Sequence, residues 1–167
     1  MVREALWGKT DAASHPNGFD MSHPLYRAVQ QLATVRAEQP ALRYGRQYFR
    51  QVSGNRTEFG ISSFPSGVLA FSRILNDEEV VVVAATTTTQ GFQGEVIVDH
   101  ELNPEGTLYK VLYSNKKDTG GSKAPGAVVD KQGGSVTIHE IDGSVTSGPA
   151  RVLPVNLQAM EIQILGR

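Results

Sequence analysis

The chain has 167 residues, 40% of them hydrophobic and 20% charged, a composition that indicates one globular domain with at most an appendage. Its formal net charge is −1, from 16 basic and 17 acidic residues. No broad positive field is therefore available for a phosphate backbone, and we expect no nucleic-acid partner. The sequence contains no cysteine, which excludes disulfides and cysteine-ligated zinc and slightly favours a reducing cytoplasm. No stretch approaches the roughly 20 apolar residues that span a bilayer, so we expect no membrane partner.

Residues 1–22 are predicted to form an irregular leading segment, because glycine, proline, serine and asparagine recur in it. A helix is expected next, within residues 23–43. Ser22 or Asp20 can cap this helix, His23 could also serve its N-terminus, and Pro24 suits its first turn. Pro40 should end it. Its apolar residues recur at three- and four-residue steps, at Leu25, Val29, Leu32 and Val35.

From Tyr44 onward the apolar residues alternate, which predicts β-strands. The candidate strands cover residues 46–52, 57–64, 68–75, 80–87, 94–99, 107–114, 136–141, 150–155 and 159–165. Short strands separated by turn clusters, with no helices between them, indicate an antiparallel sandwich or barrel over residues 44–167. The continuously apolar stretch 80–83 predicts a central strand, and residues 115–132, rich in Lys, Gly and Ser, predict a long mobile loop or irregular hairpin.

An ordered series of short passages gives the chain a family resemblance. The passage Arg3-Glu4-Ala5-Leu6-Trp7-Gly8 comes first, followed by Phe19-Asp20, His23-Pro24-Leu25-Tyr26-Arg27 and Gln39-Pro40-Ala41-Leu42-Arg43-Tyr44-Gly45. Further along, Val68-Leu69-Ala70-Phe71-Ser72-Arg73 is followed by Glu79-Val80-Val81-Val82-Val83-Ala84. The series resembles the C-terminal region of bacterial α-amylases of glycoside hydrolase family 13. Ala85 departs from the family pattern, which often has asparagine there.

The resemblance implies a fold and a function. Residues 23–43 would correspond to the last helix of a catalytic (β/α)8 barrel, and residues 44–167 to the antiparallel Greek-key β-sandwich called domain C. The family's catalytic carboxylates lie on barrel strands that would precede Met1, so we assign no catalytic residue to this chain and expect no cofactor. The implied function is that of a noncatalytic domain whose partner is the barrel of a retaining α-glucan hydrolase.

The acidic residues and histidines of the chain have structural interpretations. Asp77, Glu78 and Glu79 are predicted to form a solvated turn between two apolar strands. Glu140 and Asp142 flank Ile141, and alternation would place both on a solvent face. The group Asp99-His100-Glu101 could suggest a metal site, but a polar loop is the commoner arrangement, and the four histidines share no ligand spacing. We therefore assign no metal site.

Sugar binding is the alternative function. Exposed aromatic rings stack on the apolar faces of sugars, and Tyr109, Tyr113 and Trp7 are the candidate carbohydrate-binding residues. Tyr109 and Tyr113 lie four apart on one predicted strand, so they should share a face, although filling the sandwich core is the favoured interpretation of both. Tyr44 and Tyr48 could add to a platform. This alternative describes a stand-alone carbohydrate-binding module; adhesion through a sheet edge has no support beyond the fold class.

A chain that lacks the barrel should also leave apolar surface uncovered. The face of Leu25, Val29, Leu32 and Val35 should meet both barrel and sandwich in the intact enzyme. We therefore expect self-association through this helix face, or disorder of the first 20 or so residues.

Overall fold

The computed structural model describes residues 21–61, 67–116, 126–131 and 136–167. The chain divides into two compact units, Met1–Gln39 and Pro40–Arg167. The expectation for residues 1–20 lies outside the described residues. Within those residues the protein is one long helix and a mainly antiparallel β-sandwich, which confirms the predicted fold class.

The long helix α2 (Pro24–Glu38) begins at a proline and ends two residues before Pro40, as the sequence predicts. Its N-cap is His23, whose Nδ1 accepts a hydrogen bond from the backbone N–H of Leu25 at 3.2 Å. Gln39 is extended because it precedes Pro40. No residue of α2 is buried, and Leu25, Val29 and Leu32 are exposed. No described helix is long and apolar enough to cross a membrane.

The second unit opens with the short helix α3 (Pro40–Tyr44), which packs against β4 and β5. Gly45 joins α3 to the first strand through a close approach of two backbone segments. A Cβ atom at this position would lie 2.5 Å from the carbonyl oxygen of Ala41 and 2.8 Å from that of Ile74. Glycine is therefore required here by packing.

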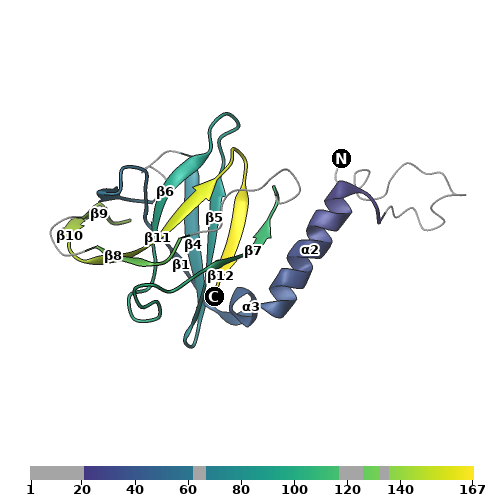
Figure 1. Ribbon diagram of the computed structural model, residues 1–167, viewed down its shortest axis with the longest axis horizontal. Helices are drawn as coiled ribbons and strands as arrows, with labels where there is room; N and C mark the ends of the chain where they lie inside the picture. Colours follow the sequence, from purple (N-terminus) through teal and green to yellow (C-terminus); the bar gives the residue numbers. More distant parts are fainter. Residues whose placement is uncertain (1–20, 62–66, 117–125, 132–135) are drawn as a thin grey trace, which may run out of the picture. The chain divides into compact units, whose positions relative to one another are not determined.

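Three sheets build the second unit (Figure 1). The five-stranded sheet has the order β1 (Arg46–Phe49), β4 (Val68–Leu75), β5 (Glu78–Ala85), β12 (Ile162–Gly166) and β7 (Lys110–Ser114). The four-stranded sheet has the order β2 (Val52–Ser53), β6 (Phe92–Ile97), β11 (Ala150–Leu157) and β8 (Val129–Lys131). The small third sheet has the order β10 (Val145–Ser147), β9 (Thr137–His139) and β3 (Glu58–Phe59).

The main core lies between the five- and four-stranded sheets, because alternate residues of both turn inward. Val81, Val83 and Leu165 contribute from the larger sheet. Val96 and Leu153, which face each other across β6 and β11, contribute from the smaller one. A second, smaller cluster joins the four-stranded sheet to the third sheet and contains Phe59, Val136, Ala150 and Val152.

The strand predictions differ from the structure at particular places. Residues 80–83 lie in β5, at the centre of the larger sheet, as predicted. The strands β8 and β10 were not expected, since they are three residues long, partly or fully exposed and carry little alternation. For residues 129–131 the predicted mobile loop is therefore wrong, whereas residues 117–125 and 132 lie outside the described ranges and the alternative of an irregular hairpin stays a prediction. The pair β3–β9 is parallel, unlike every other strand pair in the described ranges.

Candidate functional site

The residues predicted to bind sugar do not form an exposed platform in the described structure. Tyr109 is 3% exposed and Tyr113 is 7% exposed, so neither ring offers an open face for stacking. Burial raises the pKa of both phenols, and for Tyr109 the nearby carboxylate of Glu79 adds to the effect. Trp7 lies outside the described residues.

The prediction that Tyr109 and Tyr113 share a sheet face is wrong. The register between β7 and β12 shifts at a β-bulge, so that Leu165 is opposite Val111 while Ile164 is opposite Tyr113. Residues next to each other on β12 point to opposite faces. Tyr109 therefore belongs to the main core beside Val111 and Leu165, whereas Tyr113 lies on the other face of the sheet with Ile164.

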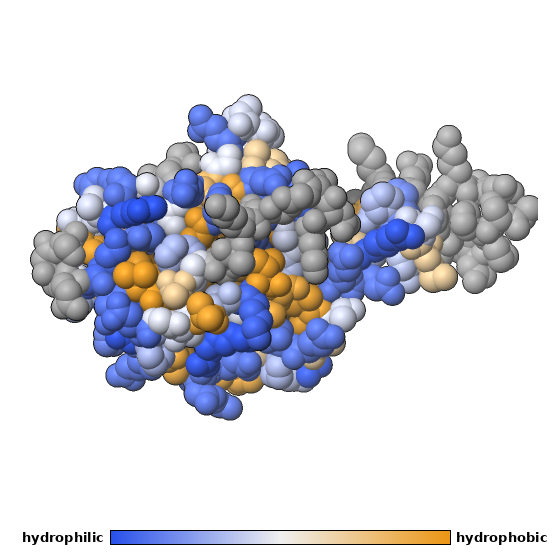
Figure 2. All heavy atoms as spheres, in the orientation of Figure 1, coloured by the Kyte–Doolittle hydropathy of each residue, from blue (hydrophilic) through white to orange (hydrophobic). Residues whose placement is uncertain are grey.

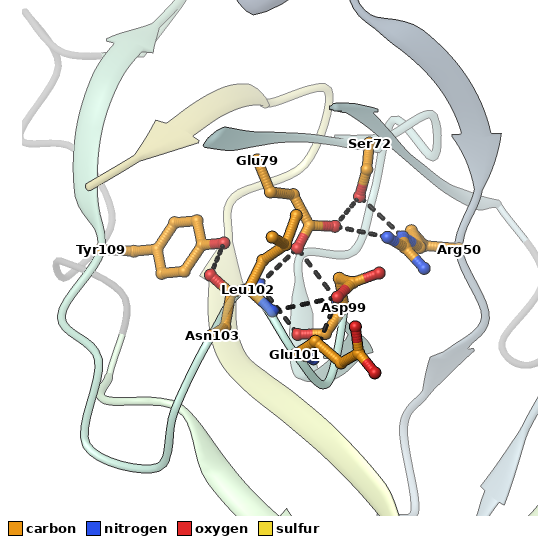
Figure 3. Close-up of polar contacts among 8 residues, drawn as sticks. All are labelled: Arg50, Ser72, Glu79, Asp99, Glu101, Leu102, Asn103 and Tyr109. Atoms are coloured by element: carbon orange, nitrogen blue, oxygen red, sulfur yellow. Dashed lines mark hydrogen bonds and ion pairs between the residues drawn. The ribbon is translucent and has the colours of Figure 1, made fainter. Parts of the chain in front are cut away.

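A buried carboxylate, Glu79, organises the polar interior of the second unit (Figure 3). Its Oε1 accepts hydrogen bonds from the Ser72 hydroxyl and, at 2.6 Å, from the Arg50 guanidinium. Its Oε2 accepts from the backbone N–H of Asp99 at 2.9 Å and from the Asn103 side-chain amide at 2.5 Å. Both oxygens thus have two donors, which compensates for the burial of the charge.

The Glu79 network corrects the prediction of a solvated turn acid. Glu79 is fully buried, whereas Asp77 and Glu78 are exposed as expected. The reason is register: the tight turn leaves Glu79 opposite Ile74 inside the β4–β5 ladder, on the side of Ser72. Tyr109 extends the network by donating its hydroxyl to Asn103 at 2.7 Å.

A second buried carboxylate, Glu161, lies just before β12 and is fully buried as well. Its Oε1 accepts from the Ser114 hydroxyl at 2.7 Å and from the Gln163 side-chain amide at 2.9 Å. Its Oε2 accepts from the backbone N–H of Gln158 at 2.6 Å. These contacts connect the end of β7, the β11–β12 turn and β12, which is a structural arrangement.

The remaining acids lie in turns and surface contacts. Asp99 accepts from the backbone N–H groups of Glu101 and Leu102, each at 3.0 Å, and thereby closes the turn after β6. Asp142 is exposed, while Glu140 is partly buried and accepts from Gln51 at 2.7 Å. Within the described ranges no group of three or more His, Asp or Glu side chains could hold a metal ion.

The tyrosines that are exposed are Tyr44, at the end of α3, and Tyr48, in β1. Each ring is covered on one side by an arginine. The guanidinium carbon of Arg43 lies 4.9 Å from the centre of the Tyr44 ring, and that of Arg50 lies 5.8 Å from the centre of the Tyr48 ring. Cation–π contacts of this kind are stabilising, and both rings remain exposed, as does the ring of Phe49 in β1.

The outer face of the five-stranded sheet, turned away from the four-stranded sheet, carries an apolar row that sequence analysis missed. We call the row the outer row; it consists of cross-strand neighbours in all five strands, Phe49, Phe71, Val82, Ile164 and Tyr113. Phe49 is 48% exposed, Phe71 is partly buried, and the other three are buried. Leu69, Ala84 and Ile162 form the next row on the same face.

An outer row of this kind is unusual for a sandwich with one core, whose outer faces are normally polar. The signal for it was present in β4 and β5, which are apolar at consecutive positions instead of alternating. In the view of Figure 2, apolar side chains reach the surface of the second unit in several places between polar ones.

A β-sandwich preceded by a helix is the class of protein that these elements define. No protein-family model matches the sequence, and no curated protein matches it either. Among solved structures, the chain is similar to the debranching enzyme from Nostoc punctiforme, with 20% identity, a TM-score of 0.47 and coverage of 86% of this chain and 21% of that one. It is also similar to the alpha-amylase from H.orenii, with 12% identity, a TM-score of 0.46 and coverage of 95% and 25%. The chain thus spans about a fifth to a quarter of the length of these two proteins.

Proposed function

We propose that the chain is a noncatalytic Greek-key β-sandwich domain of an α-amylase-type hydrolase of α-glucans, with the last barrel helix attached. The ordered sequence passages described above support this proposal, as does the order of one helix followed by a mainly antiparallel sandwich. The role of such a domain is to stabilise the catalytic barrel by covering part of its surface.

The outer row carries the proposal. A sandwich that works alone needs apolar residues only between its sheets, yet this sheet is apolar on both faces. The row ends at Phe49, an exposed aromatic residue on the β1 edge. Exposed aromatic side chains that continue a buried apolar surface are typical of a surface that another domain covers.

The helix α2 supports the same conclusion independently. Its apolar residues follow helical spacing, yet none is buried. A helix of 15 residues is marginal in water by itself and normally gains its stability from packing of its apolar face. Leu25, Val29 and Leu32 therefore need a partner surface, which the barrel would provide.

The buried carboxylates also favour a structural role. A retaining glycosidase needs two carboxyl groups about 5–5.5 Å apart on either side of a bound sugar. Glu79 and Glu161 are instead held in the interior by several donors each, where no sugar can reach them.

The test is complementation. The coding region upstream of Met1 is expressed as a separate polypeptide and mixed with the purified 167-residue chain. We expect that region to encode barrel strands, and the mixture to hydrolyse starch and to unfold at a higher temperature than the upstream polypeptide alone. The purified chain by itself should hydrolyse nothing. Hydrolysis that is abolished by substituting one of the chain's own carboxylates would contradict the proposal, as would an upstream region without barrel strands.

The alternative, a stand-alone carbohydrate-binding module, depends on Tyr44 and Tyr48, the exposed tyrosines. Its signature is binding of maltoheptaose that Tyr44→Ala and Tyr48→Ala each weaken, since stacking on one ring contributes about 1 kcal/mol. Calorimetry on the purified chain distinguishes the two functions, because the structural domain should bind no sugar at these rings.

A further inference from the structure

Ser114, Glu161 and Gln163 form a buried polar cluster between β7 and β12. Glu161 is fully buried, Gln163 is 1% exposed and Ser114 is 8% exposed. One carboxylate oxygen, Oε1 of Glu161, accepts both the Ser114 hydroxyl at 2.7 Å and the Gln163 side-chain amide at 2.9 Å. A hydroxyl group and a primary carboxamide are thereby held beside one another at a carboxylate in the interior of the fold.

The strand register brings the hydroxyl and the carboxamide within reach of each other. Ser114 on β7 and Gln163 on β12 are direct partners in the antiparallel pairing of these strands. The side chains of direct partners lie on the same face of a sheet, and their Cβ atoms are roughly 5 Å apart, a distance that an extended chain Cβ–Oγ–Cδ–Cγ–Cβ would span. The backbone therefore needs no large movement for a bond to form between the Ser114 oxygen and the Gln163 Cδ.

The carboxylate of Glu161 is fixed in orientation. Its Oε2 accepts from the backbone N–H of Gln158 at 2.6 Å, and its main-chain carbonyl accepts from the N–H of Ala85 at 2.8 Å. Oε1 is thus left to the hydroxyl and the amide together. A carboxylate that touches a hydroxyl nucleophile can take its proton, and the same group can return the proton to a leaving nitrogen. The cluster therefore combines a nucleophile, a base and a leaving group.

We propose that Ser114 and Gln163 become joined by an ester bond inside the folded chain, with Glu161 as the catalytic residue. The Ser114 oxygen attacks Cδ of Gln163 while its proton passes to Oε1 of Glu161. The C–N bond of the carboxamide then breaks, Glu161 returns the proton to the nitrogen, and ammonia leaves. One C–O bond replaces one C–N bond, so the step needs no oxidant, reductant or other co-reactant. Burial excludes the water that would hydrolyse the ester.

The ester ties β12 to β7 covalently, in a chain that contains no cysteine. β12 lies between β5 and β7 in the five-stranded sheet. A bond between residues far apart in the sequence restricts the unfolded chain, and such restriction stabilises the folded state. The inference is independent of the proposed function, because it concerns the interior of the second unit and requires no partner.

The Glu79 network provides a comparison within the same fold (Figure 3). Ser72 and Asn103 also donate to a buried carboxylate, but they donate to different oxygens of it. The strand partners of Ser72 are Tyr48 and Val81, so the register does not bring it opposite Asn103. We therefore expect no bond there, and Ser72→Ala serves as the matched control.

The test is an intact-mass measurement of the folded 167-residue chain after prolonged incubation. We expect a mass below the sequence mass by that of one ammonia molecule. Tryptic digestion should yield residues 111–116 joined to residues 152–167, because trypsin cleaves after Lys110, Lys116 and Arg151. Hydroxylamine, which cleaves esters and leaves ordinary amides intact, should separate the two peptides.

The variants assign the mass loss to the cluster. Ser114→Ala, which lacks the nucleophile, and Glu161→Gln, which lacks the base, should both have the full sequence mass, whereas Ser72→Ala should keep the deficit. If Glu161→Gln does not fold, Ser114→Ala and the wild-type digest decide. A wild-type chain of full sequence mass overturns the inference. A deficit that persists in Ser114→Ala, or one without the linked peptides, also overturns it, since asparagine side chains can lose ammonia as well.

Discussion

The carboxylate of Glu79 connects β5 to β4, to the segment between β1 and β2, and to the turn after β6. Residues distant in sequence meet at one side chain, so the effect of changing it is much larger than its position beside a hairpin turn suggests. Its charge is neutralised by Arg50, which is itself mostly buried.

Glu79→Gln should lower the free energy of unfolding by about 2–3 kcal/mol, because hydrogen bonds to charged groups are lost and Arg50 keeps an uncompensated charge. Urea denaturation at neutral pH measures the change. Glu78→Gln, one residue earlier on the same strand and exposed, is the control and should stay within about 0.5 kcal/mol of the wild type. Equal effects of the two substitutions would contradict the structural role of the network.

Tyr109 gives the protein a pH dependence on the alkaline side. Burial and the Glu79 carboxylate raise the pKa of Tyr109 above its ordinary value of 10.0. The unfolded chain therefore loses this proton at lower pH than the folded chain does. Stability from this group is fully present below pH 10 and declines as the pH rises toward the pKa in the folded state.

Tyr109→Phe should lower the free energy of unfolding by about 1–3 kcal/mol at neutral pH, because the buried oxygen of Asn103 loses its donor. The wild type loses stability at alkaline pH as this phenol ionises, whereas the variant has no phenol at this position. The difference in free energy of unfolding between the two should therefore be smaller at a pH of about 11 than at a pH of about 8. Urea denaturation at both pH values measures it. Tyr44→Phe, at an exposed tyrosine, should show no such narrowing; a difference for Tyr109→Phe that stays constant with pH would be the contrary result.

At the scale of elements, α3 and β1 are joined by the close packing at Gly45. Gly45→Ala should destabilise the second unit by about 1–3 kcal/mol, because the added methyl group meets two backbone carbonyl oxygens and one of the segments must move. Thermal unfolding is a sufficient measurement. Gly148→Ala, where an added Cβ meets nothing within 4 Å, should be neutral or slightly stabilising; similar losses at both sites would refute the packing argument.

At the scale of the whole molecule, the exposed apolar residues of α2 predict self-association of the purified chain, since contiguous apolar patches rarely remain in water. Sedimentation velocity over a range of concentrations should show a dimer or larger species. The double variant Val29→Gln/Leu32→Gln should sediment as a monomer. Gln31→Ala, at an exposed polar position of the same helix, should associate as the wild type does. A wild-type chain that sediments as a monomer at every concentration would argue against this expectation.

The sequence by itself determined the class of the fold. Pro24 and Pro40 delimit the long helix because proline restricts its own backbone and that of the preceding residue. The strand β4 was predicted to the residue, and β5 was predicted two residues too late at both ends, since long apolar strands separated by a polar turn are a strong local signal whose boundaries are less certain. The short strands β8 and β10 carry no such signal, because pairing with neighbours, and not their own composition, makes them strands.

Only the tertiary structure decided the roles of individual polar and aromatic residues. Glu79 and Glu78 are identical in type and adjacent in sequence, yet register places one inside and the other outside. A bulge of one residue sends Tyr109 and Tyr113 to opposite faces, which no periodicity in β7 indicates. The outer row exists only where several strands come together. Alternation along one strand is a local property that the sequence carries, whereas the neighbours of a side chain across the sheet depend on how distant segments pair.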